Sequence, residues 1–544
     1  MNPLFKKMVD EKTPMANEAI LRGYAKDMVS KSHEFMDAVW RSAAVSLPKG
    51  LEYVGCEVCT PQEAYNELTR GKASSRTFDI APSSLILYKF LFKYKGQMIE
   101  PRYQLLPFTD HEEPSIMYLA GTAYYVGMVL ADNVISPTDK SVFVKLLRDR
   151  LTFERIYHNF VVDNQPDLQH VVYGRLYRSS DSNKLKAERT TKASTTILHY
   201  LFARFGFTET WKRYCGFVPI IDKVEPNGDN PYKETHVQVR SSRVAPKGYI
   251  GKTYYPSNIV LYIPKEKWDA NSKNMAAAFF YIVDHFPQAI EPNFVDNTTM
   301  WIVLLGQIVF TGHYSSERLY EKISEHLSSL DKYTDTVILN KLRQEGYQIE
   351  HFYDIISLVN LNFNQWMATH QTEGVYGKTF EVFEYLLLDV VKSVFYTIFA
   401  LDKRASNLTR KPQPRDLLVK EIVEIMNKLL STGAIFRVTK GNAVVTPASC
   451  TGDNYFAKIT GHLAVQKSTT GRNATRTVID ATKRITADHA EIGNLFFLSK
   501  EDPSALRHIN PYLQIDPVTH KPIANKRFVA LLNDVNDKLK ALGE

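Results

Sequence analysis

The residues best suited to chemistry are cations placed among tyrosines in the stretch 235–265, which contains no acidic residue. Guanidinium and ammonium groups neutralise phosphates, and exposed aromatic rings stack on bases. The stretch therefore predicts a surface for a nucleic-acid backbone. A solvated basic face whose tyrosines lie in the core would give the same pattern, so that alternative stays open. The candidate binding residues are Arg240, Arg243, Lys247, Lys252, Tyr254 and Tyr255.

Two further basic clusters have the same character. The stretch 175–213 has nine Lys and Arg residues against three acidic ones, and Arg189 and Lys192 are its candidate phosphate contacts. Aromatic residues alternate with these cations and could serve as stacking faces. In the run 466–477, rich in Ser, Thr, Asn and Gly, Arg472 and Arg476 are flanked by small residues whose backbone N–H groups could meet phosphate oxygens. A plain surface loop explains this run equally well.

Signals for metal or nucleotide chemistry are weaker. Cys56 and Cys59 have C-x-x-C spacing, but no second cysteine pair or histidine pair follows, so we expect ordinary cysteines near a strand end. The run Gly248 to Thr253 resembles the end of a phosphate-binding loop. Pro246 stands where that loop needs glycine, and no helix follows, which excludes the motif. The sequence assigns no metal and no cofactor.

Acid–base groups occur in two places, at Asp163, Asp167 and His170, and at Asp488, His489 and Glu491. Neither group has a known catalytic spacing, and both lie among turn residues, where aspartate commonly forms turns or caps helices. We therefore assign no catalytic residue and expect a protein without enzymatic activity.

Charge is unevenly distributed along the chain. Residues 281–391 contain 15 Asp and Glu against 6 Lys and Arg, net −9, so the rest of the chain carries +17 to give the total of +8. This pattern predicts an acidic helical body, suited to docking other protein subunits, and at least one basic surface, suited to phosphate polymers.

Composition indicates a folded protein. The 544 residues exceed the length at which single cores stop growing, and 44% are hydrophobic, so we expect two to four domains. Asp10 and Glu11 interrupt any apolar leader, which favours a cytoplasmic location. The apolar run 299–310 is too short to span a membrane, and 386–400 is broken by charges, so no membrane association is expected.

The periodicity predicts an α+β, multi-domain fold. Short β-type runs fill the N-terminal half, at 103–108, 115–126, 141–147, 160–162, 235–240 and 257–264, and 130–139 looks like a turn. Residues 149–155 have charges spaced as on a helix. We divide the chain into an amphipathic helix (1–47), a mainly β domain (48–180), a basic α/β segment (181–270), an acidic all-helical domain (271–432) and a basic mixed domain (433–544).

Three hypotheses for function follow. The favoured one is a non-enzymatic, nucleic-acid-associated protein, an accessory subunit of a replication or transcription assembly or a component of a genome-associated particle. The second is a structural subunit that forms a homo-oligomeric particle or shell. The third is an enzyme acting on a nucleic-acid or phosphorylated substrate through residues that meet only in space. The sequence does not distinguish DNA from RNA.

Overall fold

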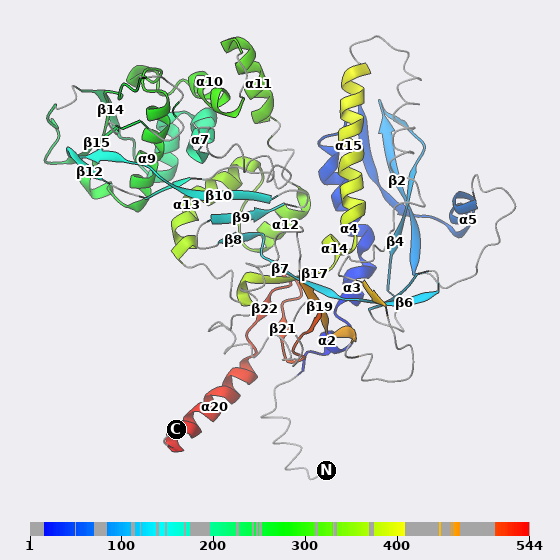
Figure 1. Cartoon of the computed structure of the whole chain (residues 1–544). Helices are drawn as coiled ribbons and strands as arrows, with labels where there is room; N and C mark the ends of the chain where they lie inside the picture. The colour runs from blue at the N-terminus through cyan, green and yellow to red at the C-terminus, as the bar shows by residue number, and fades with distance from the viewer. Residues whose placement is uncertain are drawn as a thin grey trace. The chain divides into compact units, whose positions relative to one another are not determined.

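The chain folds into two compact units, each built from separate stretches of sequence. Unit 1 comprises Met1–Asn133, Asp335–Gly346 and Gln371–Glu544, and unit 2 comprises Val134–Thr334 and Tyr347–His370. Each unit combines residues from several of the five segments proposed above, and the five-segment division stays a prediction. The computed structural model (Figure 1) describes residues 16–48, 50–69, 84–109, 115–119, 121–137, 141–146, 150–167, 170–173, 196–224, 228–241, 244–245, 249, 253–310, 314–328, 330, 335–368, 375–408, 445–447, 459, 461–467 and 506–542.

One antiparallel sheet of unit 1 packs against a helix through a cluster of aromatic rings. Trp40 of α4 (Ser32–Ala44) is fully buried, and its ring lies 5.2 Å from Phe92 and 6.0 Å from Phe90. Alternate residues of a strand share a face, so Phe90 and Phe92 both point to the helix. Because one face is covered, this sheet shows the alternating burial typical of antiparallel sheets. Its strands are β1 (Leu51–Val58), β2 (Leu85–Tyr94), β3 (Gln97–Met98) and β4 (Arg102–Pro107).

A second sheet of unit 1 joins stretches that are far apart in sequence. Its strand β7 (Met128–Asp132) pairs antiparallel with β17 (Lys378–Glu381) and parallel with β19 (Ala464–Lys467), which in turn pairs with β20 (Leu506–His508). Val129, Phe380, Leu463 and Leu513 belong to the core around it. The smaller sheets consist of β5 (Ile116–Leu119), β6 (Thr122–Val126) and β18 (Val445–Pro447), and of β21 (Gln514–Ile515) and β22 (Pro522–Ile523).

The start of the described chain is bonded to its C-terminal part. Asn17 donates through its backbone N–H to the Pro511 carbonyl at 2.7 Å and through its side-chain amide to the Leu513 carbonyl at 2.9 Å. Its side-chain oxygen also caps the first helix. The other helices among the described residues of unit 1 are α2 (Glu18–Leu21), α3 (Ala25–Ser30), α5 (Pro61–Thr69), α12 (Thr336–Gln344), α14 (Phe383–Leu386), α15 (Leu388–Leu408) and α20 (Lys526–Leu542).

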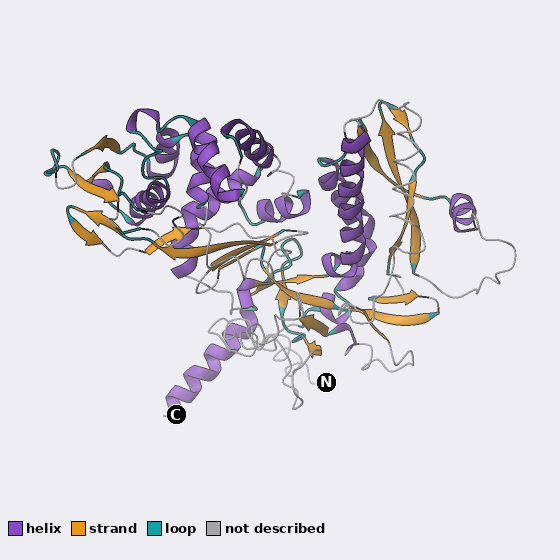
Figure 2. Cartoon of the chain, turned by 45° about the horizontal axis from the view of Figure 1, so that its top comes forward, coloured by secondary structure: helices purple, strands orange, loops and turns teal. Residues whose placement is uncertain are grey.

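Unit 2 combines two antiparallel sheets with six helices among its described residues (Figure 2). The first sheet has the order β13 (His170–Tyr173), β10 (Arg150–Tyr157), β9 (Ser141–Lys145), β8 (Ile135–Pro137). The second has the order β12 (Gln165–Asp167), β11 (Phe160–Val162), β15 (His236–Ser241), β16 (Ile259–Pro264), β14 (Ile220–Lys223). The helices are α7 (Ile197–Phe205), α8 (Phe207–Cys215), α9 (Ala270–His285), α10 (Thr298–Val309), α11 (Ser316–Ser328) and α13 (Phe352–Ala368).

The core of unit 2 is aromatic. The ring of Phe202 lies 4.8 Å from Trp301 and 5.7 Å from Phe207, and all three are buried. Gly206, at φ 80°, supplies the left-handed backbone that turns the chain from α7 into α8. Gly306 of α10 lets α11 approach closely, because a Cβ there would meet Leu319 at 2.9 Å.

The predicted α+β, multi-domain fold is confirmed, and two local predictions are wrong. Residues 149–155 were expected to be helical, but β10 occupies Arg150–Tyr157, because Leu151 and Phe153 alternate with polar residues and are buried. The expected turn at 130–139 contains the end of β7 and all of β8. Helices dominate the central part as predicted, with the single short strand β17 among its described elements.

The burial of His199 predicts that unit 2 becomes less stable at acidic pH. The side chain is fully buried, and because a carbonyl can only accept, its Nε2 donates to the Trp301 carbonyl at 3.0 Å. Burial lowers the pKa of His199 from 6.5 to about 3. Between these values the unfolded chain binds a proton that the folded chain does not, so this residue should reduce the free energy of unfolding by about 1.4 kcal/mol per pH unit as pH falls below about 6.5.

The measurement is urea unfolding of unit 2 between pH 7 and pH 4. His199→Gln keeps an amide donor at the same distance along the side chain as Nε2 but does not titrate in this range, so its unfolding free energy should fall less steeply with decreasing pH. An identical slope for the variant and the parent chain would contradict the assignment.

Candidate nucleic-acid interface

Helix α9 places one carboxylate inside unit 2. Asp284 is 0% exposed, although a charged group in the interior is costly unless it is paired. Its Oδ1 accepts from the hydroxyls of Ser241 and of Tyr254, the latter at 3.1 Å, and its Oδ2 lies 2.8 Å from His158 Nε2. Three donors from three separate stretches of chain therefore satisfy one carboxylate and are held in place by it.

The chemistry that Asp284, His158 and Ser241 can perform depends on which of them are bonded to each other. Nucleophilic catalysis by serine needs the hydroxyl bonded to a histidine that a carboxylate orients. Here Ser241 and His158 both bond to Asp284 directly. The carboxylate is thus the common acceptor of a structural cluster. It fixes the end of β15 through Ser241, and it fixes the following tyrosine-rich segment, which contains Tyr249, Tyr254 and Tyr255, through Tyr254.

Tyr254 and Tyr255, both predicted to stack on bases, have different surroundings. Tyr254 bonds to Asp284, and its ring lies edge-on 5.2 Å from Tyr249. Burial, and next the nearby Asp284 charge, raise the pKa of Tyr254, which keeps its hydroxyl protonated as a donor. The side chain of Tyr255 is 62% exposed. Of the two rings, Tyr255 is therefore the one that presents a face to solvent.

Arg240 lies in β15 and is only 9% exposed. Its guanidinium donates to the carbonyl of Gly228, in the loop that precedes the strand. A phosphate contact from Arg240 would require this internal bond to be given up. The other predicted cations, Arg189, Lys192, Arg243, Lys247, Lys252, Arg472 and Arg476, lie outside the described residues, so their roles stay predictions.

Most of the described aromatic residues that were expected as stacking faces in and next to the stretch 175–213 belong to the core. Tyr200, Phe202, Phe207, Trp211 and Tyr214 are all buried. Cations of this stretch cover other rings instead. The Arg213 guanidinium lies 4.2 Å from the centre of the Phe205 ring, and that of Arg204 lies 5.5 Å from the Tyr353 ring. The interleaving of cations and rings here reflects packing of unit 2, and the stacking interpretation of these rings is wrong.

The candidate metal and acid–base residues also have defined surroundings. Cys56 and Cys59 are free thiols near the end of β1, and burial raises the pKa of each to about 11, which disfavours the thiolate that metals and electrophiles need. Asp163 has φ 45° in the turn between β11 and β12, and its side chain accepts from the Gln238 N–H at 2.9 Å. It is a turn former, as the sequence indicated. Asp488, His489 and Glu491 lie outside the described residues.

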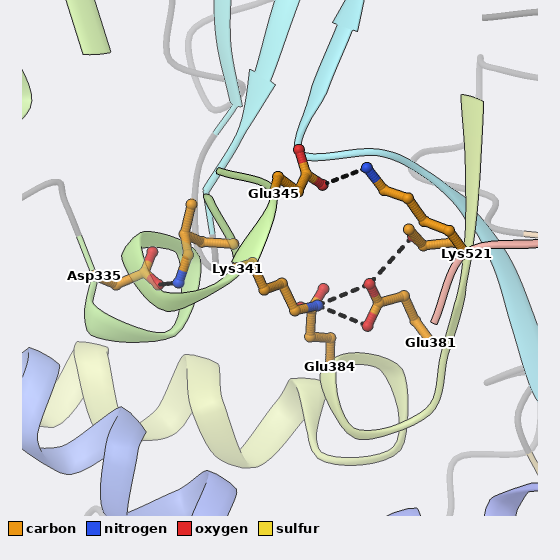
Figure 3. A network of polar contacts seen from close by, with 8 residues as sticks. Asp335, Lys341, Glu345, Glu381, Glu384 and Lys521 are labelled. Atoms are coloured by element: carbon orange, nitrogen blue, oxygen red, sulfur yellow. Dashed lines mark hydrogen bonds and ion pairs between the residues drawn. The ribbon is translucent and has the colours of Figure 1, made fainter. Parts of the chain in front are cut away.

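Unit 1 contains a second charged cluster, drawn in Figure 3, in which one lysine serves two buried carboxylates. The Lys341 ammonium lies 2.7 Å from both carboxylate oxygens of Glu381 and also bonds to Glu384. Glu381 is further bonded to Thr379, and nearby Lys521 pairs with Glu345 at 2.9 Å. Asp335 caps the helix that carries Lys341. Both glutamates are buried, so the cluster ties α12 to β17 and α14.

Comparison with known families identifies the chain. Residues 4–523 match the family described as "Non-virion RNA polymerase subunit". The chain belongs to this family. It is thus a transcription-associated subunit with protein partners in a polymerase complex, which confirms the sequence-based hypothesis at this level. No curated protein matches the sequence. Among the described helices, none is long and apolar enough to cross a membrane.

Sequence reasoning missed the central residues of both charged clusters in this polymerase subunit. One available signal was the position of Asp284, a lone acid at the end of the apolar run AAAFFYIVDH in α9. Its partners could not be found, because His158 and Ser241 lie 126 and 43 residues away. Lys341 and its glutamates look like ordinary surface charges in the sequence.

Asp284→Ala should destabilise unit 2 by about 3 kcal/mol or more, because it leaves three donors without their common acceptor. Asp284→Asn keeps one acceptor oxygen and should cost less. Urea unfolding of both variants tests this. Equal stability of Asp284→Ala and the parent chain would show that the cluster does not hold the segment.

Lys341→Met should destabilise unit 1 by about 3–5 kcal/mol, because two buried carboxylates lose their cation. The triple variant Lys341→Met/Glu381→Gln/Glu384→Gln removes all three charges and should recover much of that loss. The comparison is made by chemical denaturation at one pH. A triple variant no more stable than the single one would contradict the proposed pairing.

Proposed function

We propose that this polymerase subunit binds nucleic acid and has no catalytic role of its own. The observation that carries the proposal is the family match over nearly the whole chain, since an RNA polymerase works on a nucleic-acid template and releases RNA. The stretch 235–265 supports it: its ends are the buried strands β15 and β16, and the segment that joins these strands has no carboxylate to repel a polyanion. The contact is with the sugar–phosphate backbone, which DNA and RNA share.

The proposed interface centres on the segment anchored by Asp284. Arg243, Lys247 and Lys252 supply the phosphate contacts, and the exposed ring of Tyr255 supplies a stacking face. Tyr254 and Arg240 position this segment through Asp284 and Gly228. Arg189, Lys192, Arg472 and Arg476 extend the same kind of backbone contact from the other basic clusters.

The acidic region 271–432 is proposed as a docking surface for other subunits. On α11, Glu317, Glu321 and Glu325 are exposed and recur every four residues, which places them on one side of the helix. The buried face of the same helix carries Leu319 and Ile323. A row of exposed acidic side chains on a helix whose opposite face is packed is complementary in charge to a basic surface on a neighbouring protein. A cytoplasmic location is part of the same proposal.

The test measures binding of the purified subunit to labelled single-stranded DNA and RNA at several salt concentrations. Each neutralised phosphate contributes about −0.7 to the slope of log affinity against log salt for single strands. Arg243→Gln/Lys247→Gln/Lys252→Gln should therefore reduce the magnitude of the slope by about 2 and weaken binding to all sequences alike. Tyr255→Ala should weaken binding about tenfold without changing the slope. Tyr255→Phe keeps the aromatic ring and should bind as tightly as the parent chain.

The matched control removes three exposed cations elsewhere in unit 2, Lys233→Gln/Lys267→Gln/Arg318→Gln. Its net charge equals that of the first triple variant, so any difference between the two reports on position. Binding by the parent chain that does not vary with salt, or equal effects of the two triple variants, would reject the proposed interface.

A further inference from the structure

Helix α20 has no buried residue, although it is 17 residues long. From Asn533 to Leu542 every residue is exposed, and the exposed fractions of Val535, Leu539 and Leu542 are 44%, 40% and 78%. Figures 1 and 2 both draw α20 extending away from β21 and β22. A helix of this length is marginal in water without tertiary packing. The exposed apolar side chains are therefore the natural contact for a partner.

Five of the apolar residues of α20 form one narrow seam. Phe528, Leu532, Val535, Leu539 and Leu542 are spaced by 4, 3, 4 and 3 residues. This is the a/d spacing of a two-helix coiled coil, in which each such residue fits between side chains of a facing helix. Ala530, Asn533 and Asp537 lie on the opposite side. The seam therefore fits an amphipathic helix better than a flat surface.

The rim of the seam is positive. At 100° per residue, Arg527, Asp534 and Lys538 flank the seam on one side, and Asn536 and Lys540 flank it on the other. Asp534 is paired within the helix, 2.9 Å from Lys538. A second copy of α20 would bring the same excess of cations, and the acid on its rim, Asp534, would already be paired with its own Lys538. A helix with glutamate or aspartate beside its own seam is complementary, and such flanking charges set partner choice in coiled coils.

The base of α20 is fixed to the body of unit 1. The Asn525 side chain accepts from the Phe528 N–H at 3.3 Å and donates to the Tyr512 carbonyl at 2.8 Å. Asn525 is itself buried. The family match ends at residue 523, so α20 lies just beyond the part that the match covers. The helix is thus held firmly at its first turn and presented along the rest of its length.

We propose that α20 docks this chain onto another subunit of the polymerase, by packing its seam against an amphipathic helix with acidic residues along its rim. The choice of partner rests on the function proposed above, whereas the seam and its charge are properties of α20. The seam shares no residue with the proposed nucleic-acid interface.

The test compares Val535→Glu/Leu539→Glu, on the seam, with Ala530→Glu/Asn533→Glu, on the opposite side. Both variants add the same charge to the same helix, and neither alters a buried residue, so thermal unfolding should not change. The probe is the assembled set of remaining polymerase subunits, purified without this chain. The parent chain and the control should bind it, and the seam variant should bind about tenfold or more weakly. Lys538→Glu/Lys540→Glu should also weaken binding.

Three results would overturn the proposal. The first is equal binding by the seam variant and the parent chain. The second is a dimer of the parent chain alone, seen by light scattering, that the seam variant converts to a monomer, because the seam would then join two copies. The third is no binding of the parent chain to the remaining subunits, which would contradict the proposed function as well. The variants Arg243→Gln/Lys247→Gln/Lys252→Gln and Tyr255→Ala should still associate with the remaining subunits. Their loss of nucleic-acid binding would therefore test the nucleic-acid interface and not the α20 contact.

Discussion

Unit 1 depends on the pairing of buried charges from distant parts of the chain. Glu381 and Glu384 lie in the interior, where an uncompensated carboxylate would cost several kcal/mol. Their cation, Lys341, comes from the short stretch Asp335–Gly346, which is isolated in sequence between two parts of unit 2. Once this stretch is in place, α12 packs against α4, and β17 is positioned beside β7. The ion cluster therefore specifies which pieces of a discontinuous sequence belong together.

Unit 2 satisfies its buried carboxylate with hydroxyl and imidazole donors instead of a lysine. Asp284 is more deeply buried than either glutamate, and hydroxyl groups and an imidazole satisfy it. Hydrogen bonds to a charged acceptor are stronger than neutral ones, so the cluster can hold the end of β15 and Tyr254 in place together. This matters for the proposed function because Tyr254 directly precedes Tyr255, the exposed ring of the proposed interface.

The sequence allowed prediction of those parts of the fold that local patterns control. Strands such as β4 and β11 were found because they are short apolar runs bounded by turn residues, and α9 and α15 because their apolar residues recur at helical spacing. Residues 149–155 misled because the helical spacing of their charges was given more weight than the alternation of Leu151 and Phe153. The charged clusters could not be foreseen, since Lys341 and Asp284 find their partners only in the folded chain. Charge distribution indicated the partner class, but family membership came from comparison.

The bonds from Asn17 to Pro511 and Leu513 have a consequence for synthesis. A ribosome synthesises the chain from its N-terminus, so Asn17 must wait until the chain has grown by 496 residues before its acceptor at Leu513 is made. All of unit 2 leaves the exit tunnel in the meantime and can fold while unit 1 is still incomplete. During that interval the unpaired edges and apolar core of unit 1 are open to chaperones, proteases and neighbouring nascent chains.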